Sequence, residues 1–241
     1  MTTVGGRGGP ASDRAPAQLS PESLSADRQR ALELIPVSRE TTERLDRFVA
    51  TLLAWQQRVN LIARSTEAIL WTRHIADSLQ LLPLAPEAKV WADLGSGAGF
   101  PGLVIACALA ERRGADVHLV ESNGKKAAFL REAAHGTGAP IIVHQMRVEE
   151  FVEKAVQTFD VVTARALAPL PKLLPLAYPL LKKGALGLFL KGQDVGSELT
   201  ETAKCWRVQS SLVQSRTDVR GQIVVVRGLA PKPREKGSRP R

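Results

Sequence analysis

Cysteine is scarce in this chain of 241 residues, which contains only Cys107 and Cys205. The two lie in unlike surroundings and without the spacing of metal ligands, so the sequence supports neither a disulfide framework nor a zinc site. Long apolar runs are also missing: no stretch approaches the ~18 residues of a membrane span, and the N-terminus lacks the apolar segment of a signal peptide. We therefore expect a cytoplasmic protein that holds no metal and contacts no membrane.

Acidic residues are outnumbered by basic ones, 24 against 33, which leaves a formal net charge of +9. This positive balance favours a polyanionic partner such as a nucleic acid. With 44% hydrophobic and 24% charged residues, the composition is that of an ordinary soluble protein with one buried core.

Neither end of the chain has the composition of a folded core. Residues 1–30 are rich in Gly, Pro, Ser and Ala and contain few larger aliphatic side chains, namely Val4, Leu19 and Leu24. Because such a segment buries too little apolar surface to offset the entropy of ordering it, we predict a disordered extension over residues 1–30. Residues 231–241 hold five cations against one acid. This basic tail suits loose phosphate contacts, and a solvated terminus without a partner is the alternative interpretation.

The segment after the N-terminal extension has the pattern of helices. Between residues 41 and 58, apolar side chains recur at helical spacing and predict an amphipathic helix. Ser65 has the character of an N-cap for a second helix, which Pro83 would end. We expect residues 31–86 to form a helical cap.

Strand-like and helix-like segments alternate over residues 87–230. The predicted strands that precede helices lie at residues 89–93, 116–121, 141–144, 159–163 and 185–190. Two later strands, near residues 206–213 and 222–226, have the spacing of a hairpin. Regular alternation predicts an α/β domain with a doubly wound, Rossmann-like and mostly parallel sheet, to which the hairpin adds an antiparallel edge.

A glycine-rich turn follows the first predicted strand, within residues 90–102, and begins the next helix. Gly97, Gly99 and Gly102 satisfy the G-x-G-x-x-G pattern, in which a helix N-terminus receives the pyrophosphate of a dinucleotide. Asp93 at the strand tip opposes that interpretation, because its carboxylate would repel a pyrophosphate. S-adenosylmethionine carries a sulfonium and an ammonium and no phosphate, so the charge pattern favours this cofactor. NAD or another nucleotide is one alternative, and a tight turn that packs on the strand without a ligand is another.

A second acid, Glu121, ends the next predicted strand. An acid ~20 residues after the glycine turn accepts the ribose hydroxyls of a bound nucleoside. Sites for NAD and for S-adenosylmethionine share this feature. Glu121 therefore supports a nucleoside without choosing between the two cofactors.

Several motifs lie in order along the chain and together resemble one known family. They occupy residues 93–102, 121–126, 129–131, 147–150, 160–166 and 190–192, preceded by Asn60-Leu61 and residues 73–78. Their order and spacing resemble the ribosomal small-subunit methyltransferase G family, also called glucose-inhibited division protein B, from about Leu45 to Val226. One departure is Glu121, where family members often have Asp.

The resemblance implies a class I methyltransferase that transfers a methyl group from S-adenosylmethionine to N7 of a guanosine in the decoding-region loop of 16S rRNA (G527 in the standard numbering of that RNA). The implied partner is 16S rRNA or the small ribosomal subunit, and we expect a monomer. The family's cofactor contacts fall on Gly95, Phe100, Val148, Glu149 and Arg165. With the glycine turn and the two acids, the candidate cofactor-binding set is Asp93, Gly95, Gly97, Gly99, Phe100, Glu121, Val148, Glu149 and Arg165.

Charge and position assign a role to most of these residues. We expect Asp93 to support the cationic end of the cofactor, Glu121 the ribose, and Val148 with Glu149 the adenine edge. Arg165 follows the fourth predicted strand, where cofactor and substrate meet in sheets of this type. Its side chain could contact the cofactor, donate to guanine O6 or form a surface ion pair.

No side chain is predicted to act as a catalytic acid, base or nucleophile. After the fourth strand the chain has Thr163-Ala-Arg-Ala in place of the Asn/Asp-Pro-Pro-aromatic motif of amino-methyltransferases. Neither cysteine follows a proline, as the nucleophile of cytosine C5 enzymes usually does. Guanine N7 already has an in-plane lone pair, so displacement at this atom needs orientation and little acid–base catalysis.

Two further points stay open at the level of sequence. Arg73, His74 and Asp77 lie on one predicted helix, where Arg73 and Asp77 have the spacing of an ion pair, and docking of the cap is their plainer role. The main rival function is a basic RNA-binding or ribosome assembly factor that retains the cofactor fold without turnover. A small-molecule methyltransferase would act without RNA and leaves the basic tail unexplained.

Overall fold

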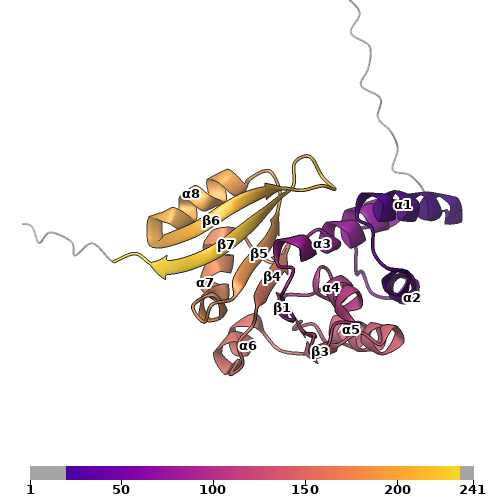
Figure 1. Cartoon of the computed structure of the whole chain (residues 1–241), viewed down its shortest axis with the longest axis horizontal. Coiled ribbons are helices and arrows are strands. Elements are labelled where there is room, and N and C mark those ends of the chain that lie inside the picture. Colours follow the sequence, from indigo (N-terminus) through magenta and orange to yellow (C-terminus); the bar gives the residue numbers. More distant parts are fainter. Residues whose placement is uncertain (1–19, 234–241) are drawn as a thin grey trace, which may run out of the picture.

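A seven-stranded sheet forms the centre of the computed structural model, which describes residues 20–233 (Figure 1). Its strands are β1 Val90–Leu94, β2 Asp116–Val120, β3 Ile141–His144, β4 Val161–Arg165, β5 Leu186–Lys191, β6 Trp206–Gln214 and β7 Gln222–Pro231. Their order is β3-β2-β1-β4-β5-β7-β6. The first five strands are parallel, whereas β7 runs antiparallel to both β5 and β6. The predicted Rossmann-like sheet with an antiparallel C-terminal hairpin is confirmed.

The strand order reverses at β1, which lies between β2 and β4. In the register of these strands, Asp93 lies level with Leu119 of β2 and with Thr163 of β4. In open α/β sheets, ligands bind outside the carboxyl ends of the strands at such a reversal. The fold therefore places the glycine turn after β1 at the usual position of a ligand site.

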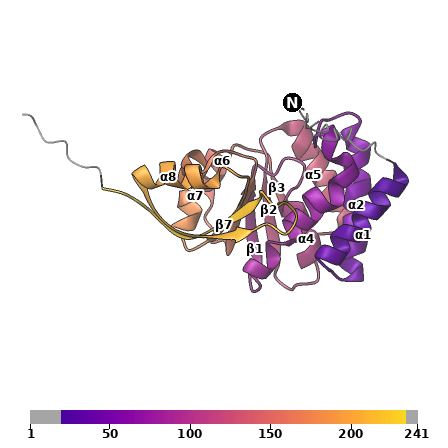
Figure 2. The same cartoon turned by 90° about the horizontal axis from the view of Figure 1, so that it is seen from above.

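Helices cover both faces of the sheet (Figure 2). On one face lie α2 Arg39–Gln56, α4 Gly102–Leu109 and α5 Gly124–Thr137, and on the other lie α6 Val148–Lys154, α7 Leu170–Leu181 and α8 Val195–Cys205. The amphipathic pattern of α2 is confirmed, because Leu45, Phe48 and Leu52 are fully buried. Each face thus has its own apolar core.

The prediction of disorder is wrong for residues 21–30, because they belong to helix α1, Pro21–Leu34. Ser20 and Ser23 form a reciprocal capping box at its start. Asp27 is buried and accepts hydrogen bonds from the backbone N–H of Thr72 at 3.0 Å and from its hydroxyl at 2.6 Å. These polar contacts and caps act together with Leu24, Leu32 and Leu34, which pack against the apolar core. Residues 1–19 lie outside the described part of the chain.

The single helix expected from Ser65 to Pro83 is also wrong. The structure has a 3₁₀ segment, Arg64–Ile69, a π-helical turn, Trp71–Ala76, the short α3, Asp77–Leu79, and a second 3₁₀ turn, Leu82–Leu84. Ser65 lies inside the first segment, whose N-cap is Ala63 and has no side-chain hydrogen bond. Apolar spacing predicted the burial of Trp71, Ile75 and Leu79 correctly, but Ile69 is exposed, and spacing does not distinguish between helices of different pitch.

The loop between β6 and β7 packs against the N-terminal cap. Gln80 accepts a hydrogen bond from the backbone N–H of Arg216 at 2.9 Å, and the Thr217 hydroxyl donates to Asp77 at 2.8 Å. The guanidinium of Arg216 donates to the carbonyl of Leu34 at the end of α1. Elements from the two ends of the sequence therefore meet at one edge of the sheet.

The described part of the chain ends at Pro233, shortly after the hairpin. The backbone N–H of Lys232 donates to the Cys205 carbonyl at 2.8 Å. Most of the predicted basic tail, residues 234–241, lies outside the described part of the chain. Within residues 20–233, no helix has the length and apolar character needed to cross a membrane.

Candidate functional site

The turn after β1 is built on glycines because its backbone needs conformations and spaces that other residues do not tolerate. Gly97 has a positive φ of 55°. At Gly102, an added Cβ would lie 2.7 Å from the Cβ of Asp93, so the start of α4 approaches β1 too closely for any side chain. The glycines of the motif thus shape the turn and pack the helix on the strand.

Asp93 lies beneath this turn and is almost completely buried, at 1% exposure. Its carboxylate accepts hydrogen bonds from the backbone N–H of Gly102 at 3.1 Å and from the Thr163 hydroxyl at 3.0 Å. Burial raises the pKa of Asp93 to about 6, although these donors act in the opposite direction. Asp93 therefore joins β1, β4 and the N-terminus of α4 through one carboxylate.

Glu121 follows β2 and holds the opposite side of the turn. Its two carboxylate oxygens accept hydrogen bonds from the backbone N–H groups of Gly97 at 2.9 Å and of Asn123 at 2.7 Å. The side chain is nearly buried but still lines a cavity. The two acids thus occupy amides of the turn and of the helix N-terminus, which a pyrophosphate would need as donors.

The cavity in front of the turn has a volume of about 420 Å³, and we call it the turn cavity. This volume falls within the ~300–1,000 Å³ typical of small-molecule sites. Of the candidate cofactor-binding residues, the turn cavity is lined by Gly95, Gly97, Phe100, Glu121, Val148 and Arg165. The remaining candidates do not line it: Asp93 is covered, Gly99 faces α4, and Glu149 is exposed on α6 beside Val148.

Other residues that line the turn cavity were not predicted to contact the cofactor. They are Leu61, His74, Ser122, Lys126, Met146 and Ala166, among others. All but Met146 lie inside the motifs that carry the family resemblance, and Met146 directly precedes the motif at residues 147–150. Membership of those motifs was the signal that could have found them, because the spacing of residues far apart in a sequence does not reveal a shared cavity.

One wall of the turn cavity is a stack of flat groups. The rings of His74 and Phe100 stack with centroids 4.8 Å apart, and the Arg165 guanidinium lies 5.9 Å from the Phe100 centroid. Burial, together with the charges of Arg165 and Arg73, lowers the pKa of His74 to about 3. His74 is therefore a neutral ring whose Nε2 lies 3.0 Å from the Thr66 hydroxyl.

The ion pair expected between Arg73 and Asp77 is not the one that the structure forms. Arg73 pairs with Asp218 of the hairpin loop at 3.4 Å, and Asp77 lies 3.5 Å from Nε of Arg165. Because Arg73 lies in the π-helical turn that ends at Ala76, directly before Asp77, the regular i, i+4 geometry of an α-helix does not apply here. Both side chains instead connect the cap to the sheet.

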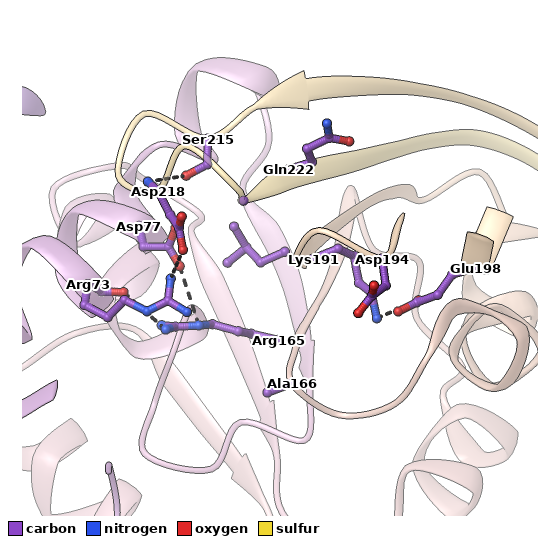
Figure 3. Close-up of a pocket in the computed structure, with 13 residues that line it drawn as sticks. Arg73, Asp77, Arg165, Ala166, Lys191, Asp194, Glu198, Ser215, Asp218 and Gln222 are labelled. Carbon is purple, nitrogen blue, oxygen red and sulfur yellow. Dashed lines mark hydrogen bonds and ion pairs between the residues drawn. The ribbon is translucent and has the colours of Figure 1, made fainter. Parts of the chain in front are cut away.

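A second cavity of about 210 Å³ opens beside the turn cavity, and we call it the hairpin cavity because residues of the β6–β7 loop line it (Figure 3). The two cavities share Arg165 and Ala166. Ala166 has a positive φ of 53°, a strained conformation for a residue with a side chain. The backbone strain therefore lies where the two cavities meet.

Metal and thiol chemistry find no support at either cavity. Among residues 20–233, no group of His, Cys, Asp and Glu side chains is arranged to hold a metal ion. Cys107 is buried in α4, and burial raises the pKa of its thiol to about 12. Cys205 is exposed at the end of α8 and lines neither cavity.

Solved structures share this fold at low sequence identity. An O-methyltransferase from Bacillus cereus, solved in complex with S-adenosylhomocysteine, aligns with a TM-score of 0.55 at 13% identity, over 86% of this chain and 99% of that one. A putative O-methyltransferase from Klebsiella pneumoniae aligns with a TM-score of 0.54, over 85% and 97% of the two chains. The fold is that of the Rossmann-like class I methyltransferases.

Closer relatives identify the family. The family model for rRNA small subunit methyltransferase G, GidB, matches residues 41–226. The ribosomal RNA small subunit methyltransferase G of Bradyrhizobium sp. strain BTAi1 is 60% identical over 210 residues, which cover 87% of this chain and 95% of that protein. The protein of the same name from Rhodopseudomonas palustris strain BisB18 is 54% identical over 212 residues, 88% and 91% of the two chains. The chain belongs to the rRNA small subunit methyltransferase G family.

Proposed function

We propose that this chain transfers a methyl group from S-adenosylmethionine to N7 of a guanosine in the decoding-region loop of 16S rRNA. Its membership of the methyltransferase G family, matched over residues 41–226, carries the assignment as an rRNA methyltransferase. The choice of N7 and of this loop rests on the family resemblance of the motifs. The net charge of +9 fits an RNA partner.

The turn cavity fits S-adenosylmethionine better than a dinucleotide. The amides that would hold a pyrophosphate already donate to carboxylates, Gly102 to Asp93 and Gly97 to Glu121. The negative charges of these acids suit a cofactor whose sulfonium and ammonium are positive. The cofactor supplies an electrophilic methyl group on that sulfonium.

Each candidate residue has a role in holding this cofactor. Glu121 holds the ribose, and Val148 with Glu149 lies along the adenine edge. Gly95, Gly97 and Phe100 shape the wall of the turn cavity. Asp93 and Gly99 act from outside the cavity, Asp93 through its charge and its hold on Gly102. Arg165 lies at the junction with the hairpin cavity.

The reaction needs orientation more than acid–base chemistry. When bound, the cofactor would supply its methyl carbon to the N7 lone pair, and sulfur would keep the electron pair of the carbon–sulfur bond that breaks. N7 carries no proton, so none has to leave. The low pKa of His74 and the raised pKa of Cys107 agree with a site that uses neither as a base or nucleophile.

Methyl transfer onto small ribosomal subunits that lack the modification tests the proposal. We expect 7-methylguanosine in 16S rRNA by nucleoside mass spectrometry, and calorimetric binding of S-adenosylmethionine. Naked 16S rRNA as a second substrate decides whether the assembled subunit is needed. Tight RNA binding without transfer would favour the assembly-factor alternative instead.

Two further proposals concern the setting of the reaction. We propose that the chain works as a monomer and in the cytoplasm, where small subunits are assembled. Sedimentation of the purified protein with and without S-adenosylmethionine checks the first point. A dimer under both conditions would contradict it.

A further inference from the structure

The hairpin cavity has charged walls of mixed sign. Its charged residues are three cations and four acids, so it has no net positive charge to attract a phosphate. They stand on two sides of the opening, with Arg73, Asp77, Arg165 and Asp218 on one and Lys191, Asp194 and Glu198 on the other (Figure 3). Such walls suit a neutral, polar ligand that has both donors and acceptors at its edges.

One carboxylate of the hairpin cavity differs from the others. Three of the four acids have partners: Arg165 and Thr217 contact Asp77, and Arg73 pairs with Asp218. Glu198 pairs with Lys191 at 2.8 Å and accepts from the backbone N–H of Leu170. Among residues 20–233, the carboxylate of Asp194 has no such partner. Asp194 precedes α8 but does not cap it with its side chain. Its carboxylate is therefore available to a ligand.

On the opposite wall, Arg165 has a donor without an acceptor. Its Nη2 donates to the carbonyl of Arg73 at 3.2 Å, and its Nε lies near Asp77. Its Nη1 is buried and finds no hydrogen-bond partner among the described residues. Because an unsatisfied buried donor is costly, Nη1 marks a place where a ligand acceptor would be favourable.

We infer that the hairpin cavity receives the acceptor guanine, with Asp194 accepting from N1–H and the 2-amino group and Arg165 donating to O6. This inference rests on the proposed function. A single hydrogen bond to O6 leaves the neighbouring N7 lone pair free, whereas a bidentate hold on O6 and N7 would block it. The arrangement selects against adenine, whose N1 is an acceptor and whose 6-amino group is a donor.

The space and position of the hairpin cavity agree with this role. Its volume of about 210 Å³ exceeds the ~150 Å³ of an apolar cavity that admits benzene. A base reaches such a pocket by leaving its stack, as in other enzymes that modify bases. Arg165 and Ala166 border both cavities. Because O6 is next to N7, a base whose O6 accepts from Arg165 would have its N7 edge at this border.

The test compares Asp194→Ala with wild type on two substrates, small subunits with guanosine at the acceptor position and reconstituted subunits with inosine, which lacks the 2-amino group. The matched control is Glu201→Gln, an exposed acid of α8 that lines neither cavity. On guanosine we expect Asp194→Ala to lower kcat/KM about 5- to 150-fold, the range of one bidentate base contact. On inosine, wild type loses activity and the additional loss from Asp194→Ala is smaller.

Three results would overturn the inference. These are a wild-type rate for Asp194→Ala on guanosine, equal losses on both substrates, or a loss explained by weaker binding of S-adenosylmethionine in calorimetry. Thermal unfolding of the variant checks that it is folded. If wild type forms no 7-methylguanosine, the proposed function fails and this inference fails with it. If wild type does form 7-methylguanosine and Asp194→Ala has the same rate, only the inferred contact between Asp194 and the guanine is refuted.

Discussion

Replacement of Asp93 by asparagine separates the charge of this buried group from its shape. The side chain is fully enclosed and holds Gly102 and Thr163 by hydrogen bonds. Burial raises its pKa from 3.8 to about 6 in the folded protein, so the ionised carboxylate is unfavourable there. Asparagine keeps a similar volume and one acceptor but removes the charge.

The sign of the effect follows from which state binds more protons. Between pH 4 and 6 the folded chain keeps a proton on Asp93 that the unfolded chain has lost, so the free energy of unfolding falls as pH rises. A shift of about two units corresponds to ~3 kcal/mol, fully expressed above pH 6. Asp93→Asn lacks this dependence. The free energy of unfolding of the variant, taken relative to that of wild type, should therefore be about 2.5 kcal/mol higher at pH 7.5 than at pH 4.

Urea unfolding of both proteins at several pH values between 4 and 7.5 measures this difference. Comparison at each pH cancels the titration of all other groups, and Glu201→Gln serves as an exposed control that should change stability by less than about 0.5 kcal/mol. A stability difference between Asp93→Asn and wild type that is the same at pH 4 and pH 7.5 would refute the reasoning. The same variant should bind S-adenosylmethionine more weakly in calorimetry, because a negative charge beneath the turn is lost.

Three further predictions concern other buried contacts. Glu121→Gln should weaken S-adenosylmethionine binding about tenfold or more in calorimetry, because the side-chain amide cannot accept hydrogen bonds from both Gly97 and Asn123. The control Glu150→Gln, which changes an exposed acid of α6, should bind the cofactor as wild type does. Asp27→Ala should lower the free energy of unfolding by about 1–3 kcal/mol, since the Thr72 amide loses its acceptor; unchanged urea unfolding would mean that α1 is not anchored there. The ring of His74, whose pKa is about 3, should show no titration by NMR between pH 8 and 5, and a midpoint near 6.5 would contradict its burial.

The sheet was predictable because its signals are local. The alternation of strands and helices and the late hairpin followed from segments that each carry their own period. Helix α1 was missed because Asp27 contacts Thr72, a residue far along the chain, and no local pattern contains that contact. The 3₁₀ and π segments before β1 were not predicted, because Trp71 and Ile75 can be buried by a helix of α, 3₁₀ or π geometry alike.

In the candidate site, too, features set by neighbouring residues were predicted and features set by distant residues were not. The turn and its two acids were found because they are contiguous with strands whose carboxyl ends share one edge of the sheet. Asp93, however, was expected at the cofactor and lies beneath the turn, since the sequence does not show how closely Gly102 approaches it. The hairpin cavity was not predicted, because its walls come from residues far apart in the sequence, such as Arg73 and Asp218, which form an ion pair.

The contact between the β6–β7 loop and the N-terminal cap also means that the two cavities depend on different lengths of chain. The turn cavity is lined by residues 61–167, whereas the hairpin cavity also needs Ser215, Asp218 and Gln222. During synthesis, the residues that line the turn cavity are therefore added to the chain before those that complete the hairpin cavity. Fragments that end before β7 lack the hairpin cavity.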